Sequence, residues 1–317
     1  MMVRVTEPIA TVRDSVSDSY MIQNFIGGMR LMLEDKTTTF FFLVLVGILV
    51  LGLVGPWVAP HEPDRTLYDE ETGEIKDLQP PSAEHPLGTT WAGYDVFSRV
   101  LIGARPTVIT GMLGGTIIIA LGMTIGITAG YVGGRTENVL MRFTDFVYGV
   151  PLLPFAIVMV TLLGVGFFTS ILIIGLVLWR SSARVLRSQV LQIKEYPFIT
   201  AATASGASTP RIIFRHVLPN VMPMAILFFA LGVGYSILIQ AGLAFLGVVD
   251  PFVPSWGVMV RNAFQSGYMS VAWWWSIVPG FLIGITVLST FMFGRGYESL
   301  ATGDGDEGEE VDTAMAG

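Results

Sequence analysis

Long uncharged stretches alternate with shorter polar segments along most of this 317-residue chain. An apolar stretch of about 20 residues is long enough to cross the hydrocarbon core of a bilayer as a helix. Six such stretches can be placed, at about 39–59, 106–131, 147–163, 168–186, 221–249 and 273–294. They lack the polar faces that the helices of a soluble helical core would carry. The pattern therefore predicts an all-α polytopic membrane protein with six transmembrane helices.

The polar segments divide the chain into five parts. Residues 1–38 are polar and mixed in charge, which indicates a cytoplasmic N-terminal tail, and 39–59 form the first transmembrane helix. Residues 60–105 form an acidic hydrophilic loop outside the membrane. Residues 106–300 form a five-helix core interrupted by the polar segment 187–220. Residues 301–317 carry six acidic residues and no basic one, a composition typical of a disordered tail.

Glycine and proline predict local features inside the core. Gly122, Gly126 and Gly130 recur every four residues, and small residues at this spacing let a neighbouring helix approach closely in lipid. A merely flexible apolar helix is the alternative. A short turn is expected over 133–145, and a break in the last helix near Pro279. Kinks are expected at Pro151 and Pro154, and an external loop is expected around 254–257.

The polar segment 195–220 contains helix signals of its own. Alanines at 201, 202 and 204 favour a short helix, since alanine loses no side-chain entropy there. Gly206 should end it in the left-handed conformation. Thr209, followed by Pro210, should begin the next helix as a hydroxyl cap. The pattern predicts a short helix, a glycine corner and an amphipathic helix, with an ordinary polar loop as the alternative.

This segment resembles the cytoplasmic coupling loop of permease subunits of binding-protein-dependent ABC importers. In that family a Glu-Ala-Ala triplet is followed after three residues by glycine, and Leu-Pro ends the loop. Thr200 stands here in place of the glutamate. The positions that match the family pattern are Ala201, Ala202, Gly206, Leu218 and Pro219. The fuller string from Gly206 through Ala207, Arg211 and Arg215 to Asn220 resembles the dipeptide/oligopeptide branch.

A second family-like segment precedes the core. It begins at His85, and Gly88, Thr89, Gly93, Asp95, Ser98 and Arg99 match the family pattern. Thr90 and Tyr94 depart from it, because the family usually has Asp and Arg there. The resemblance covers roughly residues 85–300, with both segments in the expected order.

The resemblance implies a type I ABC importer permease fold with a cytoplasmic coupling helix. It further implies a homologous second permease, two cytoplasmic ATPases and an extracytoplasmic substrate-binding protein, with no cofactor in this chain because ATP and Mg²⁺ belong to the ATPases. Peptides are the expected cargo, and nickel, glutathione and oligosaccharides are alternatives. Contacts with the ATPase are expected at Thr200, Ala201, Ala202, Ala204, Gly206, Ala207, Arg211 and Pro219.

Composition argues against catalysis in this chain. It contains no cysteine, its three histidines are far apart, and it has no phosphate-binding glycine loop and no Ser-His-Asp arrangement. We expect a non-catalytic subunit without a metal site and without a nucleic-acid partner. No N-terminal signal peptide is expected, because the first hydrophobic run begins only near Thr39.

The basic residues predict the orientation in the cell membrane. With both termini and the 187–220 loop in the cytoplasm, 13 Lys and Arg residues lie inside and five lie outside, as the positive-inside rule favours. Membrane lipid is then a partner, and Arg180, Arg184 and Arg187 are expected to meet lipid phosphates.

Gln240 is the polar residue that stands out in the fifth predicted span, and it should face the transport pathway or a partner helix. A structural interhelical hydrogen bond is the alternative. A secondary transporter and a channel are alternatives of a different class. Both usually place acidic groups within the bilayer, and no predicted span has an Asp or Glu in its interior.

Overall fold

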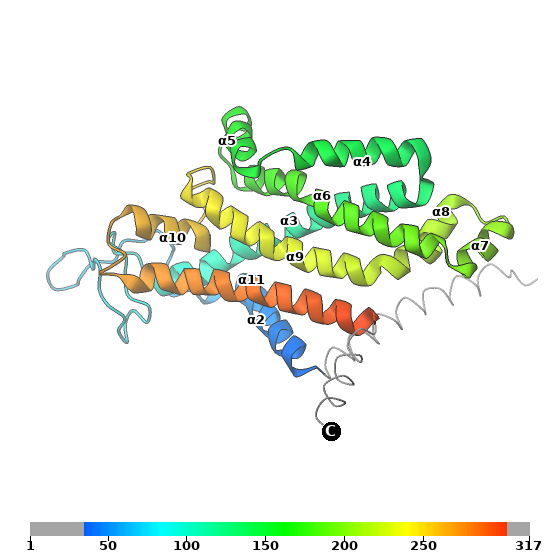
Figure 1. Cartoon of the computed structure of the whole chain (residues 1–317). Coiled ribbons are helices and arrows are strands. Elements are labelled where there is room, and N and C mark those ends of the chain that lie inside the picture. The colour runs from blue at the N-terminus through cyan, green and yellow to red at the C-terminus, as the bar shows by residue number, and fades with distance from the viewer. Residues whose placement is uncertain (1–34, 303–317) are drawn as a thin grey trace, which may run out of the picture.

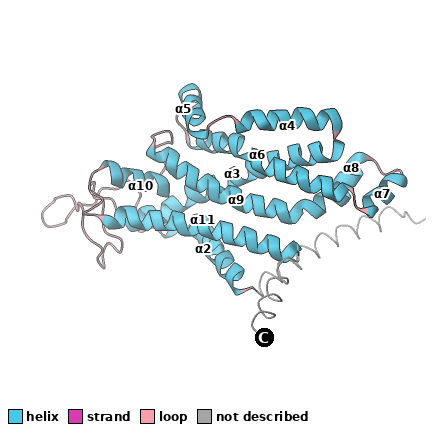
Figure 2. Ribbon diagram, in the orientation of Figure 1, coloured by secondary structure: helices cyan, strands magenta, loops and turns pink. Residues whose placement is uncertain are grey.

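The computed structural model describes residues 35–302, which fold almost entirely into helices (Figures 1 and 2). The predicted tails, 1–38 and 301–317, lie almost wholly outside the described residues. In chain order the helices are α2 (Lys36–Val58), α3 (Val96–Val132), α4 (Gly134–Tyr148), α5 (Leu152–Leu163), α6 (Phe167–Lys194), α7 (Pro197–Ala204), α8 (Thr209–Ile212), the π-helical turn η1 (Ile213–Val217), α9 (Leu218–Phe245), α10 (Trp256–Gln265) and α11 (Trp273–Thr302).

Within residues 35–302, five helices are long and apolar enough to cross a membrane by themselves: α2, α3, α6, α11 and the continuous run from α8 into α9. A sixth span exists if α4 and α5 count together, although the two are bent by 89° at the break between them. The prediction of one helix over 147–163 is therefore wrong, because α5 has only 12 residues. The expected short turn over 133–145 is also wrong, since α4 occupies it.

Two helices begin at positions that the pattern of apolar residues does not predict, and side-chain caps explain where they begin. The Asp95 carboxylate accepts a hydrogen bond from the Ser98 N–H, so α3 starts ten residues before the predicted boundary at 106. The predicted loop 60–105 thus ends at Asp95. Ser255 caps α10 through the Val258 N–H, so a helix follows directly within the expected external loop.

Prolines do not end the long helices. α11 runs through Pro279, so the predicted break there is wrong, and α3 runs through Pro106. A proline removes one backbone hydrogen bond, but packed membrane helices tolerate this loss because their neighbours and local adjustments compensate. Pro151 does act at a break, where it precedes the first residue of α5 with extended backbone angles.

Helix α3 forms the centre of the bundle and packs against α2, α6 and α9. Its glycines Gly122, Gly126 and Gly130 all lie against α6, where an added Cβ would fall 2.5 Å from the Ala183 carbonyl oxygen at Gly126 and 2.9 Å from that of Arg187 at Gly130. The close helix packing expected from their spacing is therefore present, and the partner is α6. A second set, Gly111, Gly114 and Gly115, lies against α9.

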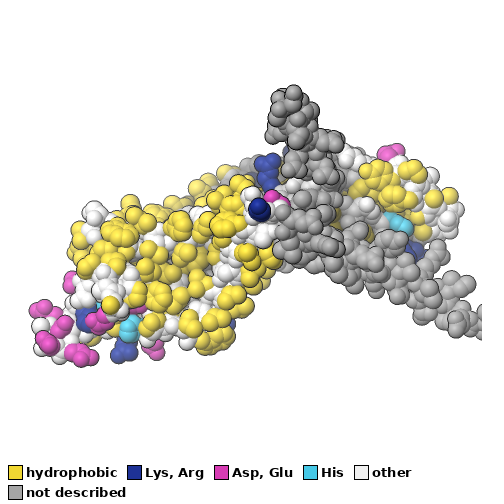
Figure 3. All heavy atoms as spheres, turned by 90° about the horizontal axis from the view of Figure 1, so that it is seen from below, with side chains coloured by type: hydrophobic (Ala, Val, Ile, Leu, Met, Phe, Trp, Pro, Cys, Tyr) yellow, Lys and Arg dark blue, Asp and Glu magenta, His cyan; other side chains and the backbone are white. Residues whose placement is uncertain are grey.

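The bundle is elongated, and α4 lies alongside α6 (Figure 1). Helices α7 and α8 lie at one end, and the loop between α2 and α3 lies with α10 at the other. Apolar side chains cover much of the length in between, while acidic side chains cluster at the end formed by that loop (Figure 3). This distribution is typical of a bundle whose middle contacts lipid.

Candidate functional site: the coupling loop

The coupling loop (187–220) contains the predicted short helix and glycine corner. Tyr196 precedes α7, whose first residue is Pro197, a favoured position for a residue without an N–H. Gly206 follows α7 with φ +79°, in the left-handed region. The N-cap of α8 is Ser208 rather than Thr209, and its side chain makes no capping hydrogen bond. The chain then continues through η1 into α9 without a break.

Two isoleucines anchor the loop to the bundle. Ile199 of α7 and Ile212 of α8 are both buried, in a cluster with Leu186, Val190 and Val217. Burying a side chain of this size stabilises a structure by about 1.5–3 kcal/mol. Lys194 adds a polar contact at the end of α6, since its Nζ donates to the Tyr131 carbonyl at 3.0 Å. The loop is therefore held in a fixed position and not merely tethered.

The predicted ATPase-contact residues separate into two groups in the structure. The exposed ones are Thr200, Ala201, Ala204, Gly206 and Arg211. Ala202 and Ala207 are half-buried and pack against the interior cluster of the loop, and Pro219 is half-buried in the first turn of α9. The outer face of α7 is thus formed by Ala201 and Ala204, while Ala202 contributes to the subunit's own packing.

Exposed aromatic side chains accompany this outer face, and sequence reasoning missed them. Tyr196 and Phe198 have ring centroids 5.6 Å apart, and Phe198 lies 6.1 Å from the His216 ring. Phe214, in η1, is 66% exposed. The signal in the sequence is the presence of aromatic residues in a polar segment that is expected to be exposed to water. Exposed aromatic side chains that lie together often mark a surface that a partner covers.

The arginines in the C-terminal half of α6 contact other groups of the protein. Arg184 pairs with Asp145 at 2.6 Å, and Arg187 pairs with Glu137. Arg180 donates to the Val147 carbonyl at 3.0 Å. The expectation that these three meet lipid phosphates is therefore replaced by a structural role, in which they fasten α4 to α6.

Gln240 lies inside the subunit. It is 1% exposed in the isolated chain, and its Nε2 has no hydrogen-bond partner among the described residues. A pathway shared with a second subunit must run along an outer surface of this one. The buried position of Gln240 therefore does not support the expectation that its side chain lines the pathway. The alternative, an interhelical hydrogen bond, is not formed by its amide nitrogen within the described residues.

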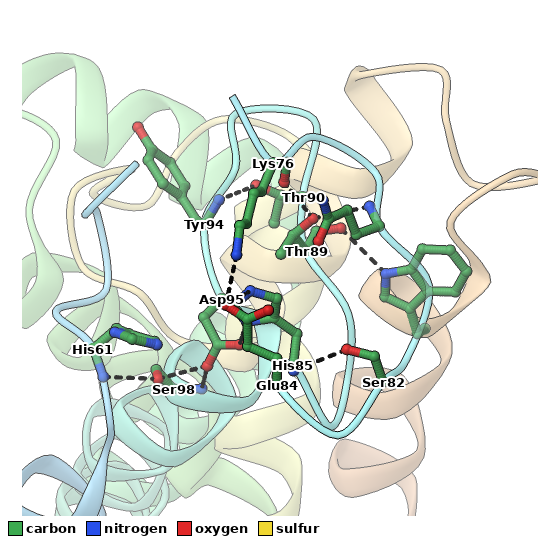
Figure 4. A network of polar contacts seen from close by, with 12 residues as sticks. His61, Lys76, Ser82, Glu84, His85, Thr89, Thr90, Tyr94, Asp95 and Ser98 are labelled. Carbon is green, nitrogen blue, oxygen red and sulfur yellow. Dashed lines mark hydrogen bonds and ion pairs between the residues drawn. The ribbon is translucent and has the colours of Figure 1, made fainter. Parts of the chain in front are cut away.

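The second family-like segment forms a hydrogen-bonded network at the N-terminus of α3 (Figure 4). Buried Asp95 accepts from the Ser98 hydroxyl and lies 3.2 Å from His85 Nδ1. The Thr89 carbonyl accepts from Trp274 Nε1 of α11 at 3.2 Å. At the surface of this network, a hydrogen bond from Lys76 lowers the pKa of Glu84. These matching residues fold the loop onto α3 and α11.

These features define a class: a multi-pass membrane protein with a structured polar loop at one end of an apolar bundle. Residues 122–297 match the family model described as the inner membrane component of binding-protein-dependent transport systems. The match covers more than half of the chain, and the chain belongs to this family of permease subunits.

Relatives extend the similarity over most of the chain. The dipeptide transport system permease protein of Bacillus subtilis is 34% identical over 271 residues, 85% of this chain and 82% of its own. The corresponding dipeptide permease protein of Alkalihalophilus pseudofirmus is 37% identical over 227 residues, 71% of this chain and 74% of its own. A glutathione transport system permease protein of Pectobacterium atrosepticum is 33% identical, over 68% of this chain and 71% of its own.

Proposed function

We propose that this chain is one of two homologous permease subunits that enclose the pathway of an ATP-driven peptide importer. The observation that carries the proposal is the anchored α7 helix with its Gly206 corner, which presents an exposed face at one end of the membrane bundle. Such a rigid, protruding helix is suited to transmit movement from a partner that binds it.

The partners follow from the same proposal. Two cytoplasmic ATPases bind ATP and Mg²⁺ and dock on the coupling loop, so this chain needs no cofactor. An extracytoplasmic binding protein delivers the substrate at the opposite end of the bundle. The chain spans the cell membrane with both termini in the cytoplasm, an orientation that the excess of basic residues on that side supports.

Short peptides are the proposed cargo because relatives named as dipeptide permeases align over most of this chain. The relative named for glutathione supports the same chemistry, since glutathione is itself a tripeptide. Nickel and oligosaccharides remain the alternative cargoes to be tested against short peptides.

The direct test is uptake of a radiolabelled dipeptide by proteoliposomes that contain this chain, its second permease, both ATPases and the binding protein. We expect accumulation that requires ATP and is unaffected by a protonophore. Uptake that persists without the ATPases and stops with a protonophore would instead support a secondary transporter. Import of nickel or oligosaccharide in place of the peptide would contradict the proposal that peptides are the cargo.

The orientation is testable by single-cysteine labelling, because the chain has no native cysteine to give background. Thr72 lies in the loop between α2 and α3, Ser208 lies in the coupling loop, and both are exposed. In intact cells Thr72→Cys should react with a membrane-impermeant maleimide, and Ser208→Cys should react only after permeabilisation. The reverse pattern would refute the proposed topology.

A further inference from the structure

A cavity of about 600 Å³ opens at the end of the bundle opposite the coupling loop. Its wall comes from three segments: the loop before α3 with the first turn of α3, the C-terminal end of α10, and the region around the start of α11. The lining residues that matter for its chemistry are Trp91, Tyr94, Arg99, Gln265, Tyr268 and Trp275. A volume of this size is typical of small-ligand sites.

The wall combines flat aromatic rings with polar side chains. Trp91 and Tyr268 are exposed, so their rings are available to a ligand. The amide of Gln265 can donate to and accept from a peptide group at the same time. The described residues that line the cavity include a single charged side chain, that of Arg99, and no acidic one. This composition disfavours a metal cation and favours a neutral or anionic organic ligand.

Two N–H groups of the wall have no hydrogen-bond partner within the described part of the chain. They are Nε of Arg99 and Nε1 of Trp275, and both side chains are more than nine-tenths buried. Nη1 of Arg99 already has partners, since it donates to the Pro63 carbonyl at 2.7 Å and to Asp64 Oδ1 at 2.8 Å. Both atoms are shielded from solvent, so they lie behind the surface of the wall. The groups that a ligand in the cavity can reach are the exposed side chains of Trp91, Gln265 and Tyr268.

We propose that this cavity is an extracytoplasmic binding site for a short peptide, which it holds by carboxylate or carbonyl oxygens and by stacking of an apolar side chain on Trp91. The proposal rests on the peptide-importer function above and adds to it a substrate site in the permease itself. A peptide suits the wall because it combines amide and carboxylate groups with a hydrophobic side chain, which match the Gln265 amide and the exposed aromatic rings of the cavity.

Trp91→Ala is the principal test, because the side chain is 54% exposed and its removal leaves the helix packing intact. Tyr68→Ala is a matched control: Tyr68 is an aromatic residue on the same loop, 57% exposed, and is not part of the cavity wall. Gln265→Ala removes the amide without touching the loop. The readout is equilibrium binding of a tritiated dipeptide to the purified importer in the absence of the binding protein.

We expect Trp91→Ala to weaken dipeptide binding about tenfold, as truncation of an anchoring aromatic typically does, and Gln265→Ala to weaken it to a smaller extent. Tyr68→Ala should bind as the unaltered protein does. Basal ATPase activity should also stay unchanged in Tyr68→Ala, because Tyr68 lies outside the cavity wall.

The outcomes separate this inference from the function on which it rests. If the unaltered importer takes up dipeptide and neither Trp91→Ala nor Gln265→Ala changes binding, the cavity is not a peptide site. If Trp91→Ala instead reduces only the affinity for the binding protein, the cavity is a docking surface and the inference is wrong. If the unaltered importer moves no peptide at all, the proposed cargo fails before the cavity is tested.

Discussion

Gly206→Val is expected to abolish substrate uptake while the subunit stays in the membrane at near-normal level. Gly206 has φ +79°, and an ideal Cβ there would meet no atom within 4 Å. The effect of a side chain at this position is therefore backbone strain rather than a clash, about 1–2 kcal/mol for a residue in the left-handed region. The strain can be relieved by shifting the corner between α7 and α8, and this shift would displace the exposed face of α7.

The measurement is ATPase activity of the reconstituted complex, with and without loaded binding protein. Gly206→Val should retain basal activity and lose the stimulation by substrate. Gly206→Asn is the matched control, because asparagine adopts the left-handed conformation far more readily than valine, and it should keep most of the stimulation. Full stimulation in the valine variant would show that the corner is only a connection between helices.

A bulky residue on the exposed face of α7 should produce the same uncoupling without backbone strain. Ala201→Trp places the ring on the outer face, whereas Ala202→Trp would press against the loop's own interior cluster and disturb the subunit. The comparison of the two variants therefore distinguishes a partner contact from internal packing. In the same assay we expect normal insertion and loss of stimulation for Ala201→Trp, and reduced accumulation for Ala202→Trp.

The coupling loop was largely predictable from the sequence because its signals are local. A glycine after an alanine-rich stretch, with a proline four residues later, favours a corner, and Gly206 adopts the expected conformation. The assignment of Ala202 to the inner side was not predictable, because it depends on Ile199 and Ile212 packing onto α6. Which face of a short helix is buried is decided by the neighbour on which it packs.

Helix α4 shows what a count of apolar residues cannot detect. Glu137 and Asp145 lie on this helix, although in the sequence they resemble the polar residues of a turn. Their partners, Arg187 and Arg184, are 50 and 39 residues away in the sequence, and the ion pairs become visible only when α4 lies along α6. For the same reason the sequence alone points these arginines to lipid, since an unpaired arginine at a membrane interface commonly meets phosphates.

Gly126→Val is expected to prevent the subunit from accumulating in a folded form. An added Cβ would lie 2.5 Å from the carbonyl oxygen of Ala183, and this oxygen is backbone that cannot rotate away. Relief would require α3 and α6 to separate along the contact that also includes Gly122 and Gly130. Overpacking of this kind costs about 1–3 kcal/mol and more where backbone must move. That is a large share of a marginal net stability of about 5–15 kcal/mol.

The matched control is Gly284→Val, which places the same side chain in a membrane helix where an ideal Cβ meets nothing within 4 Å and the position is exposed. Both variants carry the same intrinsic change in helix propensity, so their difference isolates the contact between α3 and α6. The amount of subunit that remains monodisperse after detergent extraction, together with its melting temperature, provides the measurement. Equal yields and melting temperatures for the two variants would mean that the helices adjust freely, and that the glycine spacing is a flexible stretch rather than a packing surface.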